Sequence, residues 1–185
     1  MQAFIVSLGA VALAEIGDKT QLLSLVLAAK FRKPWPICIG ILVASLLSHA
    51  IAAELGAWLA RWMTPEVQRW LIGLSFLAVA AWALLPEKEE PVDAPPRRER
   101  GVFVASVIAF FLAELGDRTQ IATVVLGAQY HPLWQVIAGS TVGMLVANVP
   151  VVFLGARFAA RLPLRATRLA AAALFAALGA WILLR

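Results

Sequence analysis

Long apolar runs constrain the fold of this chain of 185 residues more than any other feature of its sequence. Hydrophobic residues make up 62% of the chain and charged residues 15%, a balance too apolar for the surface of a soluble globular domain. A helix needs about 20 apolar residues to cross a bilayer. The sequence therefore predicts an all-α integral membrane protein with six transmembrane helices, at residues 3–29, 36–60, 67–85, 102–128, 134–156 and 167–184.

A polar segment between Pro86 and Arg100 separates these runs into two groups of three. It contains four prolines and nine charged residues, which makes it too polar for the bilayer and too rich in proline for a helix. We therefore predict a first three-helix repeat at 1–86, a charged, proline-rich cytoplasmic linker at 87–99 and a second three-helix repeat at 100–185.

The two groups are copies of one ancestral unit. A shift of 99 residues aligns 1–86 with 100–185 without a gap, and 28 of the 86 aligned pairs are identical. Each copy has three predicted spans, and because three is an odd number, the second copy enters the membrane from the opposite side. We therefore expect two repeats of inverted topology.

Basic residues at the ends of the spans and between them favour one orientation of this topology. Eleven of these residues fall on one side of the membrane, and the other side carries only Arg61, Arg69 and Arg185. By the positive-inside rule the side with eleven basic residues is cytoplasmic. This orientation predicts a multi-pass protein of the inner (plasma) membrane with both termini extracytoplasmic. The richer side carries eleven basic residues: Lys30, Arg32, Lys33, Lys88, Arg97, Arg98, Arg100, Arg157, Arg161, Arg165 and Arg168.

A short charged block interrupts the first run near its middle and recurs at the same place in the fourth. Each charged residue at a helix centre costs about 2.5–3.5 kcal/mol on insertion scales, so six of them would oppose insertion by roughly 15–21 kcal/mol if they faced lipid. We therefore expect the block to face the protein interior and to find partners there. Its members are Glu15, Asp18 and Lys19 in the first copy and Glu114, Asp117 and Arg118 in the second.

The spacing of the polar residues in this block predicts a cation site. Residues three apart lie on one face of a helix, so each copy presents an acidic pair followed by a glutamine. If the two copies face each other, four carboxylates and two amide oxygens converge, and oxygen ligands of this kind suit a hard cation. The candidate metal ligands are Glu15, Asp18, Gln21, Glu114, Asp117 and Gln120.

The charge of the block suggests what the site exchanges. Four carboxylates and two bases leave a net charge of −2, which is unfavourable in a medium of low dielectric constant. One divalent cation or two protons would neutralise it. An exchanger of one divalent cation for two protons is therefore our hypothesis for this site.

Two features of the block have alternative interpretations. Its charged residues could form a structural network in which Arg118 pairs with the acids of the first copy and Lys19 with those of the second. Gly17 and Gly116 could mark a local unwinding of each helix, which frees backbone carbonyls, or could instead permit close helix packing. Two acids for every base favour function over a purely structural network.

These residues carry a resemblance to a known family. Glu15 to Thr20 and Glu114 to Thr119 both match Glu-x-Gly-Asp-(Lys/Arg)-(Ser/Thr), the paired signature of the Gdt-type divalent cation/proton antiporters. The resemblance covers nearly the whole chain. It implies export of Mn²⁺ or Ca²⁺ in exchange for protons, with short bacterial members linked mainly to Mn²⁺ efflux, and it implies that Glu15, Asp18, Glu114 and Asp117 bind the metal.

Other classes of function fit the sequence less well. Intramembrane aspartyl proteases also place an aspartate on each of two helices, but a protease dyad has no use for the matched glutamates or the adjacent bases, so we expect no enzyme. A cation channel or an amino-acid exporter are further alternatives. We expect protons, a divalent ion and the lipid bilayer as partners, no bound cofactor and no nucleic acid, and the sequence is compatible with a homo-oligomer.

Overall fold

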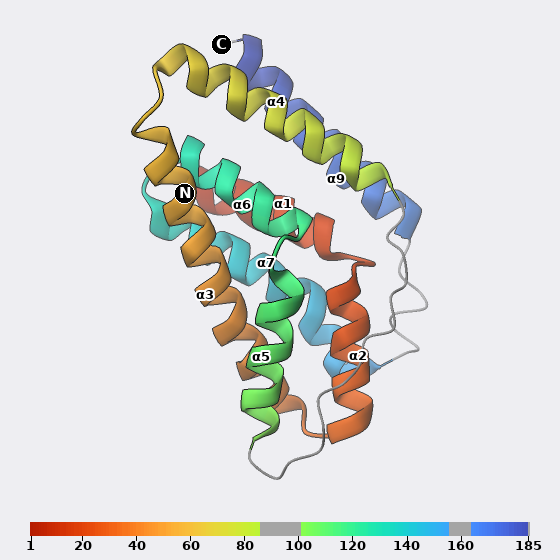
Figure 1. Cartoon of the computed structure of the whole chain (residues 1–185). Coiled ribbons are helices and arrows are strands. Elements are labelled where there is room, and N and C mark those ends of the chain that lie inside the picture. The colour runs from red at the N-terminus through yellow and green to blue at the C-terminus, as the bar shows by residue number, and fades with distance from the viewer. Residues whose placement is uncertain (86–100, 156–163, 185) are drawn as a thin grey trace.

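The computed structural model describes residues 1–85, 101–155 and 164–184, and these residues form eight α-helices and no β-strand (Figure 1). The all-α prediction is therefore confirmed for the described ranges, while the predicted linker at 87–99 lies outside them. In chain order the helices are α1 (Gln2–Glu15), α2 (Lys19–Phe31), α3 (Pro34–Ala60), α4 (Pro65–Leu84), α5 (Val102–Glu114), α6 (Arg118–Gln129), α7 (Leu133–Leu154) and α9 (Leu164–Leu184).

Four of these helices, α3, α4, α7 and α9, are long and apolar enough to cross a membrane. Helices α1 and α5 are apolar but shorter, with 14 and 13 residues. Helix α3 exposes large apolar side chains such as Ile39, Leu46 and Ile51, as a helix in contact with lipid does. These features fit a multi-pass membrane protein, and the six-span topology stays a prediction.

The predicted helices at 3–29 and 102–128 are each divided into two. Helix α1 ends at Glu15 and α2 begins at Lys19, and α5 and α6 are separated at the equivalent place. Gly17 and Gly116 lie in these gaps with φ of 85° and 75°, a left-handed conformation that favours glycine. The sequence left open whether these glycines mark a local unwinding or permit close helix packing, and the structure shows the local unwinding.

Helix boundaries follow the 99-residue shift between the copies. The shift carries Lys19–Phe31 onto residues 118–130, where α6 occupies Arg118–Gln129. It carries the start of α3 at Pro34 onto the start of α7 at Leu133. The duplication seen in the sequence therefore recurs in the helices, while the inverted orientation of the copies stays a prediction.

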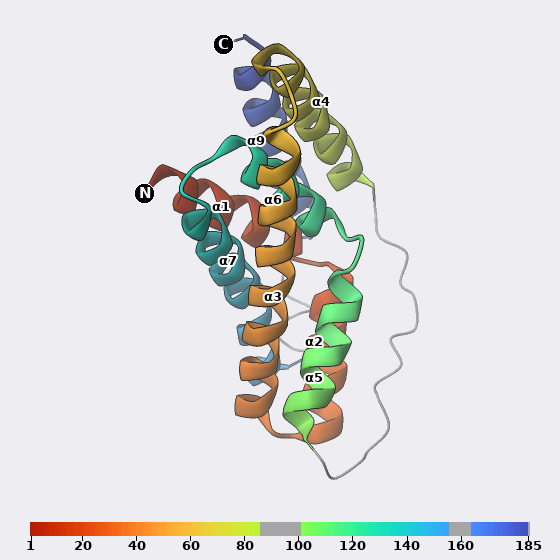
Figure 2. The ribbon, with the colours of Figure 1, turned by 60° about the vertical axis from the view of Figure 1, so that its left-hand side comes forward.

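Helices of each copy pack against the long helix of the other copy. Helix α1 packs on α7 as α5 packs on α3, and α2 packs on α7 as α6 packs on α3. Helices α4 and α9 pack against each other at one end of the molecule in both views, whereas α2 and α5 lie side by side at the other end (Figures 1 and 2). Each broken helix therefore depends on the long helix of the other copy for its core contacts.

Small residues allow α3 and α6 to approach closely. A Cβ atom added at Gly56 of α3 would overlap the carbonyl oxygen of Val124, and one added at Gly127 of α6 would overlap the backbone of Ala53. Helices that approach this closely in a membrane gain van der Waals contact that larger side chains would prevent.

We expect Gly56→Ala to destabilise the protein, because its methyl group would push α3 away from α6. Overpacking of this kind costs about 1–3 kcal/mol. Gly9→Ala is the matched control, since nothing lies within 4 Å of a Cβ at Gly9. The measurement is thermal unfolding of both variants in one detergent, and equal melting temperatures would contradict the close approach.

Candidate metal centre

Each helix break places one aspartate at the start of a new helix. Asp18 and Asp117 are the N-cap residues of α2 and α6, with extended backbone angles that redirect the chain after the glycine. Asp117 caps its helix directly, since its Oδ2 accepts hydrogen bonds from the backbone N–H of Thr119 at 3.2 Å and from the Thr119 hydroxyl at 3.0 Å. The positive ends of two helix dipoles therefore lie beside the acidic residues.

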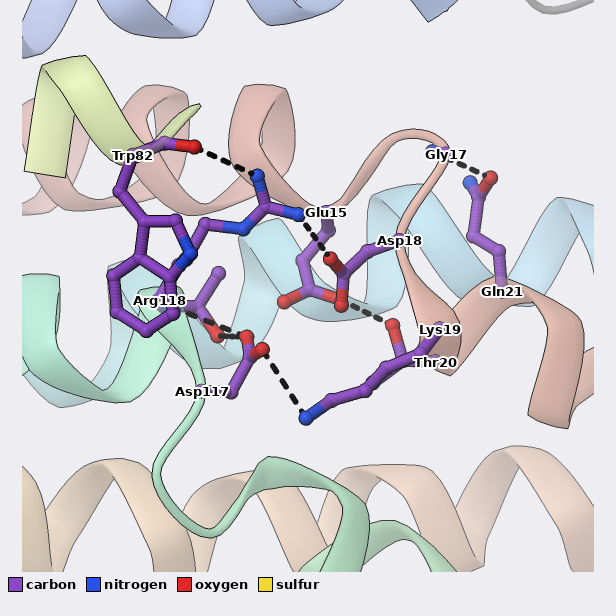
Figure 3. Close-up of polar contacts among 10 residues, drawn as sticks. Glu15, Gly17, Asp18, Lys19, Thr20, Gln21, Trp82, Asp117 and Arg118 are labelled. Atoms are coloured by element: carbon purple, nitrogen blue, oxygen red, sulfur yellow. Dashed lines mark hydrogen bonds and ion pairs between the residues drawn. The ribbon is translucent and has the colours of Figure 1, made fainter. Parts of the chain in front are cut away.

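The glutamine of each motif stabilises the break. The backbone N–H of Gly17 donates to Oε1 of Gln21 at 2.9 Å (Figure 3), and that of Gly116 donates to Oε1 of Gln120 at 2.7 Å. Gln21 Nε2 in turn donates to the carbonyl of Ala147 at 2.9 Å. Because an amide oxygen has two lone pairs, these bonds leave one for another partner, and the predicted ligand role of both glutamines stays a prediction.

Three of the four predicted carboxylates come together. Glu15, Asp18 and Asp117 each offer a carboxylate oxygen, and these oxygens all lie within 4.8 Å of one another. Their exposed fractions are 0%, 2% and 2%. The cluster therefore combines residues of both copies in a buried position, as the spacing of the motifs indicated.

Glu114 lies outside this group of three because a hydroxyl of α3 holds it. Ser45 Oγ donates to Glu114 Oε1 at 2.7 Å, and Glu114 is 1% exposed. The equivalent of Ser45 in the second copy is Met144, which cannot donate in this way. Glu15 instead accepts from the hydroxyl of Thr20 in its own copy. The two halves of the motif are therefore alike in sequence and different in contact.

The two bases of the motif form ion pairs across the copies. Nη2 of Arg118 lies 3.0 Å from Oδ1 of Asp18, and Nζ of Lys19 lies 3.4 Å from Oδ1 of Asp117 (Figure 3). Arg118 also donates to the carbonyl of Trp82 at 3.4 Å. The structural alternative predicted that each aspartate pairs with the base of the other copy. Both of these ion pairs are present, and they connect one copy to the other.

Neutral groups, by contrast, solvate the glutamates. Each of them accepts a hydroxyl hydrogen bond on one oxygen, Glu15 from Thr20 and Glu114 from Ser45. Within the part of the chain that the structure describes, the second oxygen of each has no hydrogen-bond partner and is buried. Since buried polar atoms normally have a partner, these two oxygens indicate a site that takes up a further group.

Ser45 is the contact that the sequence analysis missed. It lies in an apolar run with no charged neighbour, and the block of Glu114 gives no reason to link the two. A comparison of the copies offered one signal, because Ser45, Ser48 and His49 align with Met144, Ala147 and Asn148. At these positions α3 has three polar residues and α7 has one. This difference would have suggested that α3 contributes a hydrogen-bond donor to the site.

Removing Arg118 should destabilise the protein more than removing Lys19. The Arg118 side chain is 6% exposed, and Arg118→Gln would leave the buried Asp18 without its cation, at a cost of about 3–5 kcal/mol. The Lys19 side chain is 39% exposed, and Asp117 keeps its bonds from Thr119, so Lys19→Gln should cost about 1 kcal/mol or less. Thermal unfolding in detergent measures both, and similar losses would contradict the difference in burial.

Comparisons with known proteins identify the family of this chain. The family described as "Divalent cation/proton antiporter GDT1" matches residues 3–91 and 102–185. A protein of Vibrio cholerae serotype O1 named "Putative manganese exporter" is 51% identical over 95% of this chain and 87% of its own length. A GDT1-like protein of Synechocystis sp. is 30% identical over 86% of this chain and 85% of its own length. No solved structure matches the chain. The chain belongs to the GDT1 family of divalent cation/proton antiporters.

Proposed function

We propose that this protein exports Mn²⁺ across the membrane in exchange for protons, by alternating access of one site to the two sides. The observation that carries this proposal is the buried group of three carboxylates, Glu15, Asp18 and Asp117, drawn from both copies. Ca²⁺ is the alternative cargo.

The separation of the carboxylates supports a shared cation. Oxygen ligands of Ca²⁺ lie at about 2.3–2.6 Å from the ion, so two ligands on opposite sides of one ion are about 5 Å apart. Oxygens within 4.8 Å of one another can therefore contact a single ion. Hard divalent cations such as Mn²⁺, Ca²⁺ and Mg²⁺ prefer this all-oxygen environment.

Charge balance supports the exchange of the cation for protons. Each aspartate has a basic partner from the other copy, whereas the partners of the two glutamates are hydroxyls. The block therefore keeps an excess of two negative charges in apolar surroundings, where uncompensated charge is costly. One divalent cation or two protons removes that excess, and the presence of both would leave an excess of positive charge.

The broken helices support alternating access. Unwound segments at the interface of two repeats let a site change its exposure without unfolding the helices on either side. Both breaks lie at the carboxylate site, and the ion pairs of Asp18 and Asp117 cross between the copies. A cation that competes for these carboxylates would therefore weaken the contacts that hold the copies together.

We further propose that the chain crosses the inner membrane six times as two inverted repeats, 1–86 and 100–185, with both termini extracytoplasmic. In this topology α1 with α2, and α5 with α6, each make one crossing around a break. The excess of basic residues on one side and the exchange of packing partners between the copies support it.

The choice of Mn²⁺ over Ca²⁺ rests on the relatives. The Vibrio cholerae protein that is 51% identical is named "Putative manganese exporter", whereas the oxygen ligands alone suit either ion. A channel or an amino-acid exporter would not need a site whose charge matches one divalent cation. A protease dyad that shares one proton is disfavoured because both aspartates are paired with bases.

A growth test identifies the cargo. We expect the wild-type chain to protect a bacterial strain that lacks Mn²⁺ efflux against excess Mn²⁺, and Asp18→Asn and Asp117→Asn to lower the tolerated concentration at least about tenfold, as loss of a metal ligand should. Glu66→Gln is the matched control, because it removes an exposed carboxylate of α4 that lies outside the site. Protection against excess Ca²⁺ alone would assign the alternative cargo.

Transport in proteoliposomes tests the coupling to protons. We expect an imposed pH gradient to drive Mn²⁺ movement. Glu15→Gln should reduce that movement strongly, while its elution profile in size-exclusion chromatography should equal that of the wild-type protein. The reason is that glutamine keeps the shape of the side chain but holds neither a proton nor a charge. Mn²⁺ flux that does not respond to the pH gradient would indicate a channel.

A further inference from the structure

A second polar pocket lies away from the carboxylate site. It has a volume of about 240 Å³ and is lined by residues from the start of α4, the last residue of α6 and the last turn of α9. Its lining residues are Pro65, Gln68, Arg69, Gln129, Trp181 and Ile182. Three helices from both copies therefore contribute to one cavity.

The polar groups of this pocket favour an anion. Of the lining residues, Arg69 is charged, and its Nε is buried without a hydrogen-bond partner among the described residues. A guanidinium presents its N–H groups as a planar fork that matches two oxygens of a phosphate. The Arg69 guanidinium also lies over the Trp70 ring, 5.9 Å from its centroid, which restricts its orientation.

Amide groups surround this cation. Nε2 of Gln68 donates to the carbonyl of Ala128 at 2.9 Å, which holds the Gln68 side chain against the end of α6. Gln129, the last residue of α6, lines the same cavity. Glu66 lies three residues before Arg69 on α4 but does not line the pocket. The cavity therefore presents a positive charge and neutral hydrogen-bonding groups.

The depth of the pocket favours a lipid as the source of the anion. Helix α4 is a candidate span that begins at Pro65, so the pocket lies at the end of a span. Trp70 and Trp181 are 49% and 43% exposed at this end, and exposed tryptophans gather at the level of the lipid headgroups. An arginine that lies between helices at that level is placed to contact the phosphate of a phospholipid.

The volume limits how much of the ligand enters. A cavity of about 240 Å³ is smaller than the roughly 300–1,000 Å³ of pockets that enclose a drug-sized ligand, yet much larger than a single water needs. It can hold a phosphate with part of its ester. Apolar chains attached to that ester would leave over Trp181 and Ile182, which line the apolar part of the cavity.

We propose that this pocket binds the phosphodiester of an anionic phospholipid, with Arg69 contacting the phosphate oxygens and the amides of Gln68 and Gln129 contacting the ester oxygens. The bound lipid joins α4, α6 and α9. It sits at the opposite end of α6 from Arg118, and the proposal does not depend on which cation the protein carries.

Lipid binding to the purified full chain in an uncharged maltoside detergent tests this proposal. Native mass spectrometry should detect one tightly bound phosphatidylglycerol, and Arg69→Gln should weaken this binding at least tenfold. Arg61→Gln is the matched control, because it removes a basic residue just beyond α3 that does not line the pocket, and its binding should equal that of the wild type. Glu66→Gln should retain binding or strengthen it, since it removes a nearby negative charge.

Three results would overturn the proposal. One is equal binding by the wild type and Arg69→Gln, and another is an equal loss in Arg69→Gln and Arg61→Gln. The third is displacement of phosphatidylglycerol by millimolar glycerol 3-phosphate or inorganic phosphate, which would identify a water-soluble phosphate as the ligand. If Arg69→Gln does not fold, Arg69→Lys decides the matter, because it keeps the charge, loses the planar fork and should bind several times more weakly than the wild type.

Discussion

Buried charge that pairs with a base of the other copy is the constraint on which the rest of this structure depends. Asp18 and Asp117 are each 2% exposed, and each pairs with a base from the opposite repeat. A charge left alone in these surroundings would cost several kcal/mol. The copies therefore have to meet at the breaks, and the exchange of packing partners between α1 or α5 and the long helices follows from that meeting.

The sequence predicted the all-α character of the fold and led to the hypothesis for the site, and it did so through energy arguments that need no coordinates. Charged residues in an apolar run must face inward, so the expectation is that Glu15, Asp18, Glu114 and Asp117 converge, and the structure groups three of these four, without Glu114. The roles of Gln21 and Gln120 at the backbone could not be predicted from helical spacing, because a donor at Gly17 or Gly116 becomes available only after the helix unwinds there. The hydrophobic periodicity of a sequence describes intact helices and does not predict where a helix breaks.

The motif also could not predict how the contacts of its residues differ between the two copies. Lys19 and Arg118 occupy equivalent positions, yet one side chain is 39% exposed and the other 6%, and Arg118 also donates to the carbonyl of Trp82. Glu15 and Glu114 likewise accept hydroxyl bonds from different helices. The two similar motifs thus have chemically distinct surroundings, and one difference is that Ser45 of α3, which donates to Glu114, aligns with Met144 of α7.

The cross-copy ion pairs also have a consequence for biosynthesis. Arg118 follows Asp18 by 100 residues, so the ribosome must add all of them before this aspartate can meet its partner. At about 5–20 residues per second, the wait lasts roughly 5–20 seconds. During that interval the newly made α1 and α2 hold their acidic residues without the second copy, and the insertion machinery or a bound proton has to shelter them from the acyl chains.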